Sequence, residues 1–367
     1  MPIFMFLSPA GLSARRSRLA AAATGVCTCL ALAGCASWDA PVQEQTQQLA
    51  DTLASTGDPH EARGVSLVEN VSEVEPVGTT AQRLLPVELT DADGYDVTVT
   101  DTSRILALDL YGTYTKTLRG IGLAENLVGR TVSSAEPSLA DLPVVTENGH
   151  SINVEAVLNL RPSLVIVDHS VGPAEAIDQI RAAGVTTVVM EPQRSMASMA
   201  EDIENLAAVV GEPDAGKALA ERSQRELDEA LSAIREAAPE VPLRMSFLYA
   251  RGTGGVFYLL GEEDGTRDLI TALGGTDVNS EHGIGAASPA SPEALAEVNP
   301  ELFVMMKGGL TSTGDIDGLL QRPGVAQTTA GQHRRVLALP DGDSLAFGPQ
   351  TGELLLRAAH ALYGEAQ

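Results

Sequence analysis

The sequence has 367 residues, with 24 basic and 49 acidic side chains, and its formal net charge at pH 7 is −25. A surface this acidic argues against a nucleic-acid-binding protein, because phosphate contacts need lysine and arginine. It suits a soluble protein outside the cytoplasm better, and by itself it identifies no ligand.

Residues 1–34 have the three parts of an export signal. Three arginines between residues 15 and 18 precede the apolar run LAAAATGVCTCLALAG, and the small-residue stretch Leu32-Ala33-Gly34-Cys35 follows. That tetrapeptide resembles a bacterial lipobox, which implies cleavage before Cys35, a diacylglycerol on its thiol and a lipid anchor in the membrane. The alternatives are an ordinary secretory signal and an N-terminal membrane helix, for which the apolar run is short.

The cysteines agree with this interpretation. Cys27 and Cys29 would leave with the signal and Cys35 would carry the lipid, so the mature chain would have no free thiol. Disulfides, cysteine-ligated metals and cysteine nucleophiles are thereby excluded.

Residues 35–100 are rich in Gln, Glu, Ser, Thr and Pro and have no sustained apolar period. We expect an acidic and polar tether, which would let a lipidated protein stand off its membrane.

From Ser103 onward, short apolar runs alternate with helical patterns, which is typical of parallel α/β units. One helix is expected over residues 173–183, with Gly184 just beyond its end. The expected strands are residues 104–110, 163–168, 186–190, 244–250, 301–306 and 335–340.

The chain also contains an internal repeat. Glu155 and Glu293 each precede a proline by seven residues, and an apolar strand follows each proline. A second match, between residues 115–122 and 266–274, lies upstream in each half. Two motifs in the same order indicate two lobes of related topology, although chance similarity between two βα units is the alternative.

Between the halves lies a long helical segment broken only at residues 211–213. After Pro213 the apolar residues recur at helical spacing, which predicts a helix of about 25 residues and close to 37 Å. We therefore expect two Rossmann-like α/β lobes with parallel-rich sheets, residues 101–195 and 241–367. One long backbone helix within residues 196–240 would join them, with a ligand cleft between the lobes.

These features together resemble the helical-backbone substrate-binding lipoproteins of ABC importers for iron-siderophores, vitamin B12 and haem. The resemblance covers residues 100–365 and is specific for the fold and the transport role. It implies a monomer at the extracellular face of the membrane, with an ABC permease and its ATPase as partners.

Two rims of the expected cleft carry iron-binding side chains. His150 lies in the loop before the first repeat helix, and Tyr249 lies near the end of the strand RMSFLYA. Imidazole and phenolate are both axial ligands of haem iron. Arg251 lies two residues on in an extended chain and thus on the same face as Tyr249, where its charge favours a phenolate.

Here the resemblance narrows to the haem-binding lipoproteins of actinobacterial uptake systems, which have a histidine in the N-lobe and a Tyr-x-Arg-Gly-x-Gly-Gly segment in the C-lobe. It implies that His150 and Tyr249 ligate ferric protoporphyrin IX (haem b), with Arg251 supporting the tyrosinate. Met306 matches a pocket methionine that flanks the macrocycle or replaces a lost histidine. His169 and His282 are reserve candidates.

Glu155 and Glu293 suit the first turns of helices, where a carboxylate meets the positive end of the helix dipole. In the family, one acidic residue per lobe docks onto arginines of the permease, and these two glutamates are at the matching positions.

Two alternatives remain open. A siderophore or cobalamin receptor of the same fold would present several basic or aromatic residues in its cleft, and this chain is only 4% aromatic with its single tryptophan, Trp38, in the tether. A secreted hydrolase or metal enzyme is the other, but no Gly-x-Ser-x-Gly, His-Glu-x-x-His or Walker pattern is present. We therefore do not expect an enzyme.

Overall fold

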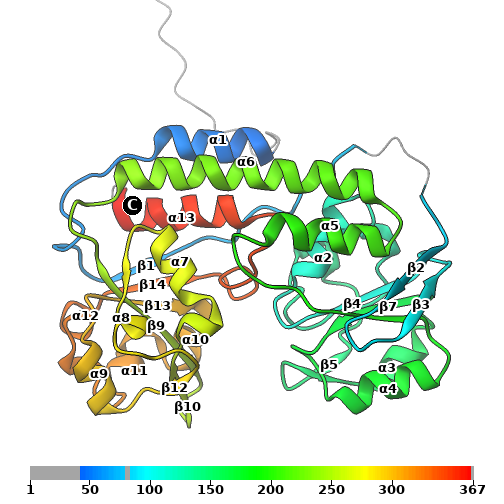
Figure 1. Cartoon of the computed structure of the whole chain (residues 1–367). Helices are drawn as coiled ribbons and strands as arrows, with labels where there is room; N and C mark the ends of the chain where they lie inside the picture. The colour runs from blue at the N-terminus through cyan, green and yellow to red at the C-terminus, as the bar shows by residue number, and fades with distance from the viewer. Residues whose placement is uncertain (1–41, 79–82, 365–367) are drawn as a thin grey trace, which may run out of the picture. The chain divides into compact units, whose positions relative to one another are not determined.

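The N-lobe is built on a three-stranded parallel sheet in the order β4-β7-β8 (Figure 1). The computed structural model describes residues 42–78 and 83–364. The three strands are β4 (Ile105–Leu108), β7 (Leu164–Asp168) and β8 (Thr187–Met190), and almost every residue in them is buried. Continuous apolar strands of this kind are expected where a parallel sheet is covered on both faces.

The C-lobe sheet has seven strands among the described residues. Its centre is parallel, with β9 (Arg244–Arg251) beside β13 (Leu302–Met306) and β13 beside β14 (Val336–Leu339). The antiparallel strand β10 (Val256–Leu259) forms a hairpin with β9. The remaining strands are β1 (Val65–Leu67), β11 (Thr276–Asp277) and β12 (Ser288–Pro289).

All six predicted strands are present, each within two residues of the expected ends. The predicted helix after β7 is α4 (Ala174–Ala182), and Gly184 follows it with φ +86°. The strands of the α/β core therefore lie where the sequence predicted them.

The internal repeat corresponds to equivalent elements in the two lobes. α3 (Val154–Asn159) precedes β7, as α9 (Pro292–Val298) precedes β13. The upstream match forms α2 (Thr113–Gly120) in the N-lobe and α7 (Thr266–Ala272) in the C-lobe. The expectation of two related lobes is confirmed at the level of these elements.

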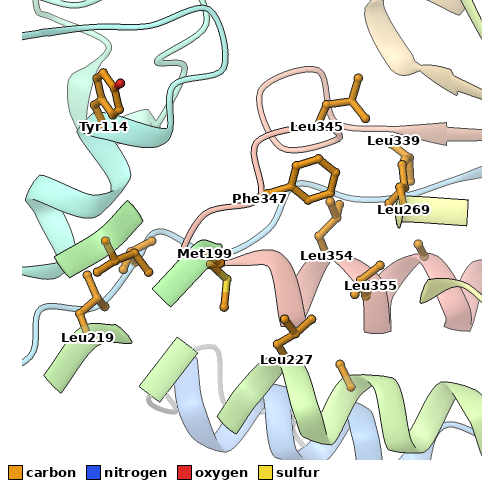
Figure 2. Close-up of a cluster of buried hydrophobic side chains, with 14 of the residues drawn as sticks. Tyr114, Met199, Leu219, Leu227, Leu269, Leu339, Leu345, Phe347, Leu354 and Leu355 are labelled. Carbon is orange, nitrogen blue, oxygen red and sulfur yellow. The ribbon is translucent and has the colours of Figure 1, made fainter. Parts of the chain in front are cut away.

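The backbone helix is α6 (Pro213–Ala237), which has 25 residues and begins with proline at its first position. It packs against α5 (Met199–Val209) toward one lobe and against α13 (Thr351–Tyr363) toward the other (Figure 1). Figure 2 shows Leu227 of α6 and Leu354 of α13 among the side chains of the largest buried cluster. The long helix therefore belongs to a core shared by both lobes.

The N-terminal segment contradicts the expected tether. Residues 42–99 contain the helix α1 (Val42–Thr52), the strand β1 and the hairpin β2 (Val87–Thr90) with β3 (Asp96–Val99). α1 packs on α6 and α13, and β1 pairs with β14. The prediction was wrong here because α1 and β1 take their partners from distant parts of the chain, α6, α13 and β14.

The expected signal sequence and Cys35 lie outside the described residues. Within residues 42–78 and 83–364, no helix has the length and apolar character needed to cross a bilayer.

The remaining α-helices are short ones in the C-lobe: α8 (Val278–Glu281), α10 (Lys307–Ser312), α11 (Asp315–Leu320) and α12 (Thr329–His333).

Candidate ligand-binding site

His150 lies at the tip of a small hairpin in the N-lobe, formed by β5 (Thr146–Glu147) and β6 (Ser151–Ile152). Asn148 and Gly149 adopt positive φ angles of 51° and 90°, a backbone that this dipeptide favours. The imidazole of His150 is exposed, and no hydrogen bond to it is found from the described residues. The hairpin thus presents a free imidazole to solvent, as a ligand-binding role requires.

An open pocket of about 760 Å³, open solvent included, lies beside this hairpin and is lined by both His150 and His169. His169 is held by a 2.7 Å contact between its Nε2 and Asp93 Oδ1, and this hydrogen bond lowers the pKa of Asp93. The reserve candidate His169 therefore shares a pocket with His150, with one ring nitrogen already engaged.

The wall of this pocket is fixed by buried charges at the carboxyl ends of β4 and β7. Asp168 accepts hydrogen bonds from Arg194 and from Ser170, and Arg194 lies 3.7 Å from Asp109. Burial raises the pKa of Asp109 to about 6, and the charge of Arg194 opposes this rise. This network holds the loop after β7 and thus the position of His169.

Tyr249 and Arg251 occupy the end of β9 in the C-lobe, and both are partly exposed. The expectation that they share a face is confirmed, because the guanidinium carbon of Arg251 lies 4.9 Å from the centroid of the Tyr249 ring. Tyr258 of β10 is directly opposite Tyr249 in the hairpin. A phenol and a cation are thus stacked at one edge of the sheet.

Met306 joins this pair from the neighbouring strand. Its Sδ lies 3.3 Å from Nη2 of Arg251. The same guanidinium nitrogen donates a 2.9 Å hydrogen bond to Oδ1 of Asp341, just after β14. Asp341 did not appear among the predicted site residues, although it directly follows a predicted strand.

The structure therefore brings together three of the predicted residues, Tyr249, Arg251 and Met306. Among the described residues no contact joins His150 to any of them. His282 at the end of α8 uses its Nδ1 in a 2.8 Å hydrogen bond with the carbonyl of Val278. No group of three or more His, Asp or Glu side chains suited to a metal ion occurs in residues 42–78 and 83–364.

Glu155 and Glu293 occupy the second positions of α3 and α9, as the sequence predicted. The N-caps of the two helices are Asn153 and Ser291, whose side chains accept hydrogen bonds from backbone amides. Both glutamates are exposed, and neither forms an ion pair with another described residue. Because capping is carried out by their neighbours, both carboxylates are available to a partner.

Comparison with known proteins identifies the family to which this architecture belongs. A model of the family described as "Periplasmic binding protein" matches residues 109–342, which is more than half of the chain. The chain belongs to the periplasmic binding protein family. Such a protein holds its ligand without transforming it, and the expectation of a non-enzymatic protein is confirmed.

Among solved structures, this periplasmic binding protein is similar to the heme binding protein HmuT, with 63% identity and a TM-score of 0.82 over 84% of this chain and all of that one. It is also similar to the periplasmic heme-binding protein RhuT from Roseiflexus sp. RS-1, at 34% identity, with a TM-score of 0.67 over 73% of this chain and all of that one. A curated relative is an uncharacterized ABC transporter substrate-binding lipoprotein, YvrC of Bacillus subtilis. It is 23% identical over 76% of this chain and 86% of its own length.

The solved HmuT structures include three variants in which a histidine, a tyrosine and an arginine were each replaced by alanine. The separations between these three positions along the HmuT chain equal those between His150, Tyr249 and Arg251. Residues of the same types thus occur at the same spacing in both chains.

Proposed function

We propose that this protein is an extracytoplasmic haem receptor, which captures ferric protoporphyrin IX and delivers it to an ABC permease driven by an ATPase. The observation that carries the proposal is the stacked Tyr249 and Arg251 pair at the C-lobe sheet edge. Similarity to two heme-binding proteins, one of them 63% identical, supports haem as the cargo. The system would be of the kind found in actinobacteria.

In this proposal Tyr249 and His150 are the two axial ligands of the haem iron. A phenol must lose its proton to bind ferric iron well, and a guanidinium beside its ring favours the resulting anion. Arg251 supplies that charge, and Met306 beside it offers a thioether next to the macrocycle or a substitute ligand. The equal spacing of the three substituted residues in HmuT supports this assignment.

A titration of the purified protein with haemin tests the cargo. We expect a Soret band with ferric features, and His150→Ala should change the spectrum while leaving measurable binding. His169→Ala is the matched control, since it removes a second histidine from the same pocket. Absence of haemin binding by the wild type, or binding of cobalamin or a ferric siderophore in its place, would contradict the proposal.

We also propose that Glu155 and Glu293 dock the protein onto arginines of the permease, one from each lobe. Charge reversal at either position, Glu155→Lys or Glu293→Lys, should spare haem binding and reduce haem uptake by cells about tenfold or more, as loss of a charged contact at an interface does.

Asp214→Lys and Asp268→Lys provide matched controls for docking. Both residues are exposed acids in the first turn of a helix, on α6 and α7. Uptake in cells with these variants should stay at the wild-type rate. Normal uptake with both glutamate variants would rule out docking through these residues.

The proposal places the mature protein at the extracellular face of the membrane as a monomer anchored through lipid on Cys35. The sequence before Cys35 and the lipoprotein name of the Bacillus relative support this. Cys35→Ser should then release the protein into the medium, and fractionation of cells would detect the change. Retention of that variant in the membrane fraction would contradict lipid anchoring.

A further inference from the structure

Arg251 forms an ion pair with Asp341, which is not among the residues of the proposed haem site. Its Nη2 donates to Asp341 Oδ1 at 2.9 Å, and the other carboxylate oxygen of Asp341 accepts from the backbone N–H of Gly308 at 2.6 Å. The side chains of Arg251 and Asp341 are 36% and 41% exposed. One carboxylate thus joins β9 to the start of α10, directly beside Tyr249.

Two consecutive glycines make room for this ion pair. A Cβ at Gly308 would lie 2.8 Å from Asp341 Oδ1, and a Cβ at Gly309 would lie 2.8 Å from Arg251 Nη1. Neither glycine has a positive φ, so the backbone conformation does not explain them. The ion pair therefore packs directly against the backbone at both glycines, and a Cβ at Gly309 would also lie 2.8 Å from the carbonyl oxygen of Ala250.

The loop that carries Asp341 is also held from the N-lobe. Nζ of Lys116 on α2 donates to the carbonyl of Gly342 at 2.6 Å and lies 3.1 Å from Asp343 Oδ1. Lys116 is buried. Asp341 is therefore placed by fixed contacts on both sides, as a residue that positions another side chain must be.

The charge of Arg251 is shared between the Tyr249 ring and the carboxylate of Asp341. The guanidinium stacks on the Tyr249 ring, but its hydrogen bonds go to Asp341, to the sulfur of Met306 and to the carbonyl of Ala250. No hydrogen bond to the Tyr249 hydroxyl is present among the described residues. A carboxylate at hydrogen-bond distance offsets much of the positive field that would otherwise stabilise a phenolate.

We infer that Asp341 is a positioning residue, which holds Arg251 against Tyr249 and, by sharing its charge, keeps the tyrosinate–iron bond weak enough for haem to be released. The inference rests on the proposed function. Asp341 would thereby allow the release of haem, which a delivery protein needs as well as capture, because haem that is bound too tightly cannot be transferred to a permease.

The test is Asp341→Asn, which keeps the shape of the side chain and removes its charge. Transfer of haem from the loaded variant to apomyoglobin should be about three- to tenfold slower than from the wild type, the size expected for one partly screened charge. The tyrosinate-to-iron charge-transfer band should also shift, which a purely structural role would not cause.

Asp317→Asn is the matched control, because it breaks an arginine–aspartate pair of the same kind on the surface of the same lobe, with Arg334 as the partner. Its release rate should equal that of the wild type. In an Arg251→Ala background, Asp341→Asn should change release by less than about twofold, since Asp341 acts through Arg251.

The outcomes separate the two proposals. A wild type that takes up no haemin ends the proposed function and this inference with it. A wild type that binds haem while Asp341→Asn releases it at the same rate or faster, with an unchanged charge-transfer band, overturns the role of Asp341 alone.

Discussion

Tyr249→Phe and Tyr249→Ala are expected to lose haem at least on the order of 100-fold faster than the wild type, a larger effect than removal of His150. The phenolate oxygen is the anionic ligand in the proposed site, and the Arg251 guanidinium stacked on its ring favours that anion. The phenylalanine variant keeps the ring on which Arg251 stacks. Faster loss of haem from this variant would therefore report on the phenolate oxygen alone. Haem transfer to apomyoglobin and the loss of the tyrosinate charge-transfer band measure the effect.

Tyr258→Phe is the control for this experiment. Tyr258 lies directly opposite Tyr249 on the neighbouring strand of the hairpin and is also partly exposed. Removing its hydroxyl should leave both the spectrum and the release rate unchanged. If Tyr249→Phe retained the wild-type spectrum, or if Tyr258→Phe lost it, Tyr249 would not be the iron ligand.

Gly352→Val is expected to lower the free energy of unfolding by about 2 to 3 kcal/mol, the usual cost of inserting side-chain atoms into a packed core. Gly352 lies in α13, and a Cβ at this position would come 2.7 Å from the carbonyl carbon and oxygen of Glu226 on α6. Backbone atoms of a helix cannot move aside as a flexible side chain can. Urea denaturation followed by circular dichroism measures the loss.

Gly78→Ala serves as the comparison, because a Cβ at Gly78 meets no atom of the described residues within 4 Å and its φ is not positive. This variant should unfold within about 0.5 kcal/mol of the wild type, as surface changes usually do. A Gly352→Val protein as stable as Gly78→Ala would mean that α13 is not packed against α6 as closely as the structure has it.

The α/β core was predictable because its signals are local. The strands β4 and β13 are uninterrupted apolar runs and β7 is apolar up to its last residue, Asp168, while the apolar residues of α6 recur at helical spacing after a proline. α1 gave no such signal, since eight of its eleven residues are polar and its partners α6 and α13 lie far along the chain. Long-range packing, rather than propensity, makes this segment a helix.

The candidate site was predictable in its residue types but not in its contacts. Tyr249 and Arg251 share a face because alternate residues of a strand do. Asp341 could have been anticipated, since the carboxyl ends of neighbouring parallel strands meet at one edge and a predicted strand ends just before it. The pairing of Asp341 with Arg251 could not, because it depends on how closely the chain approaches at the two glycines 308 and 309.

The order in which the N-terminal segment finds its partners has a consequence for biogenesis. The amide of Thr56 donates to the carbonyl of Tyr363, His360 contacts the carbonyl of Leu49, and β1 pairs with β14. Residues 49–67 can therefore make these contacts only after residues 336–363 have been synthesised. Because folding of this segment depends on contacts with the C-terminal helix, it stays unfolded until that helix has been made. An unfolded chain is the form that passes through a secretion channel.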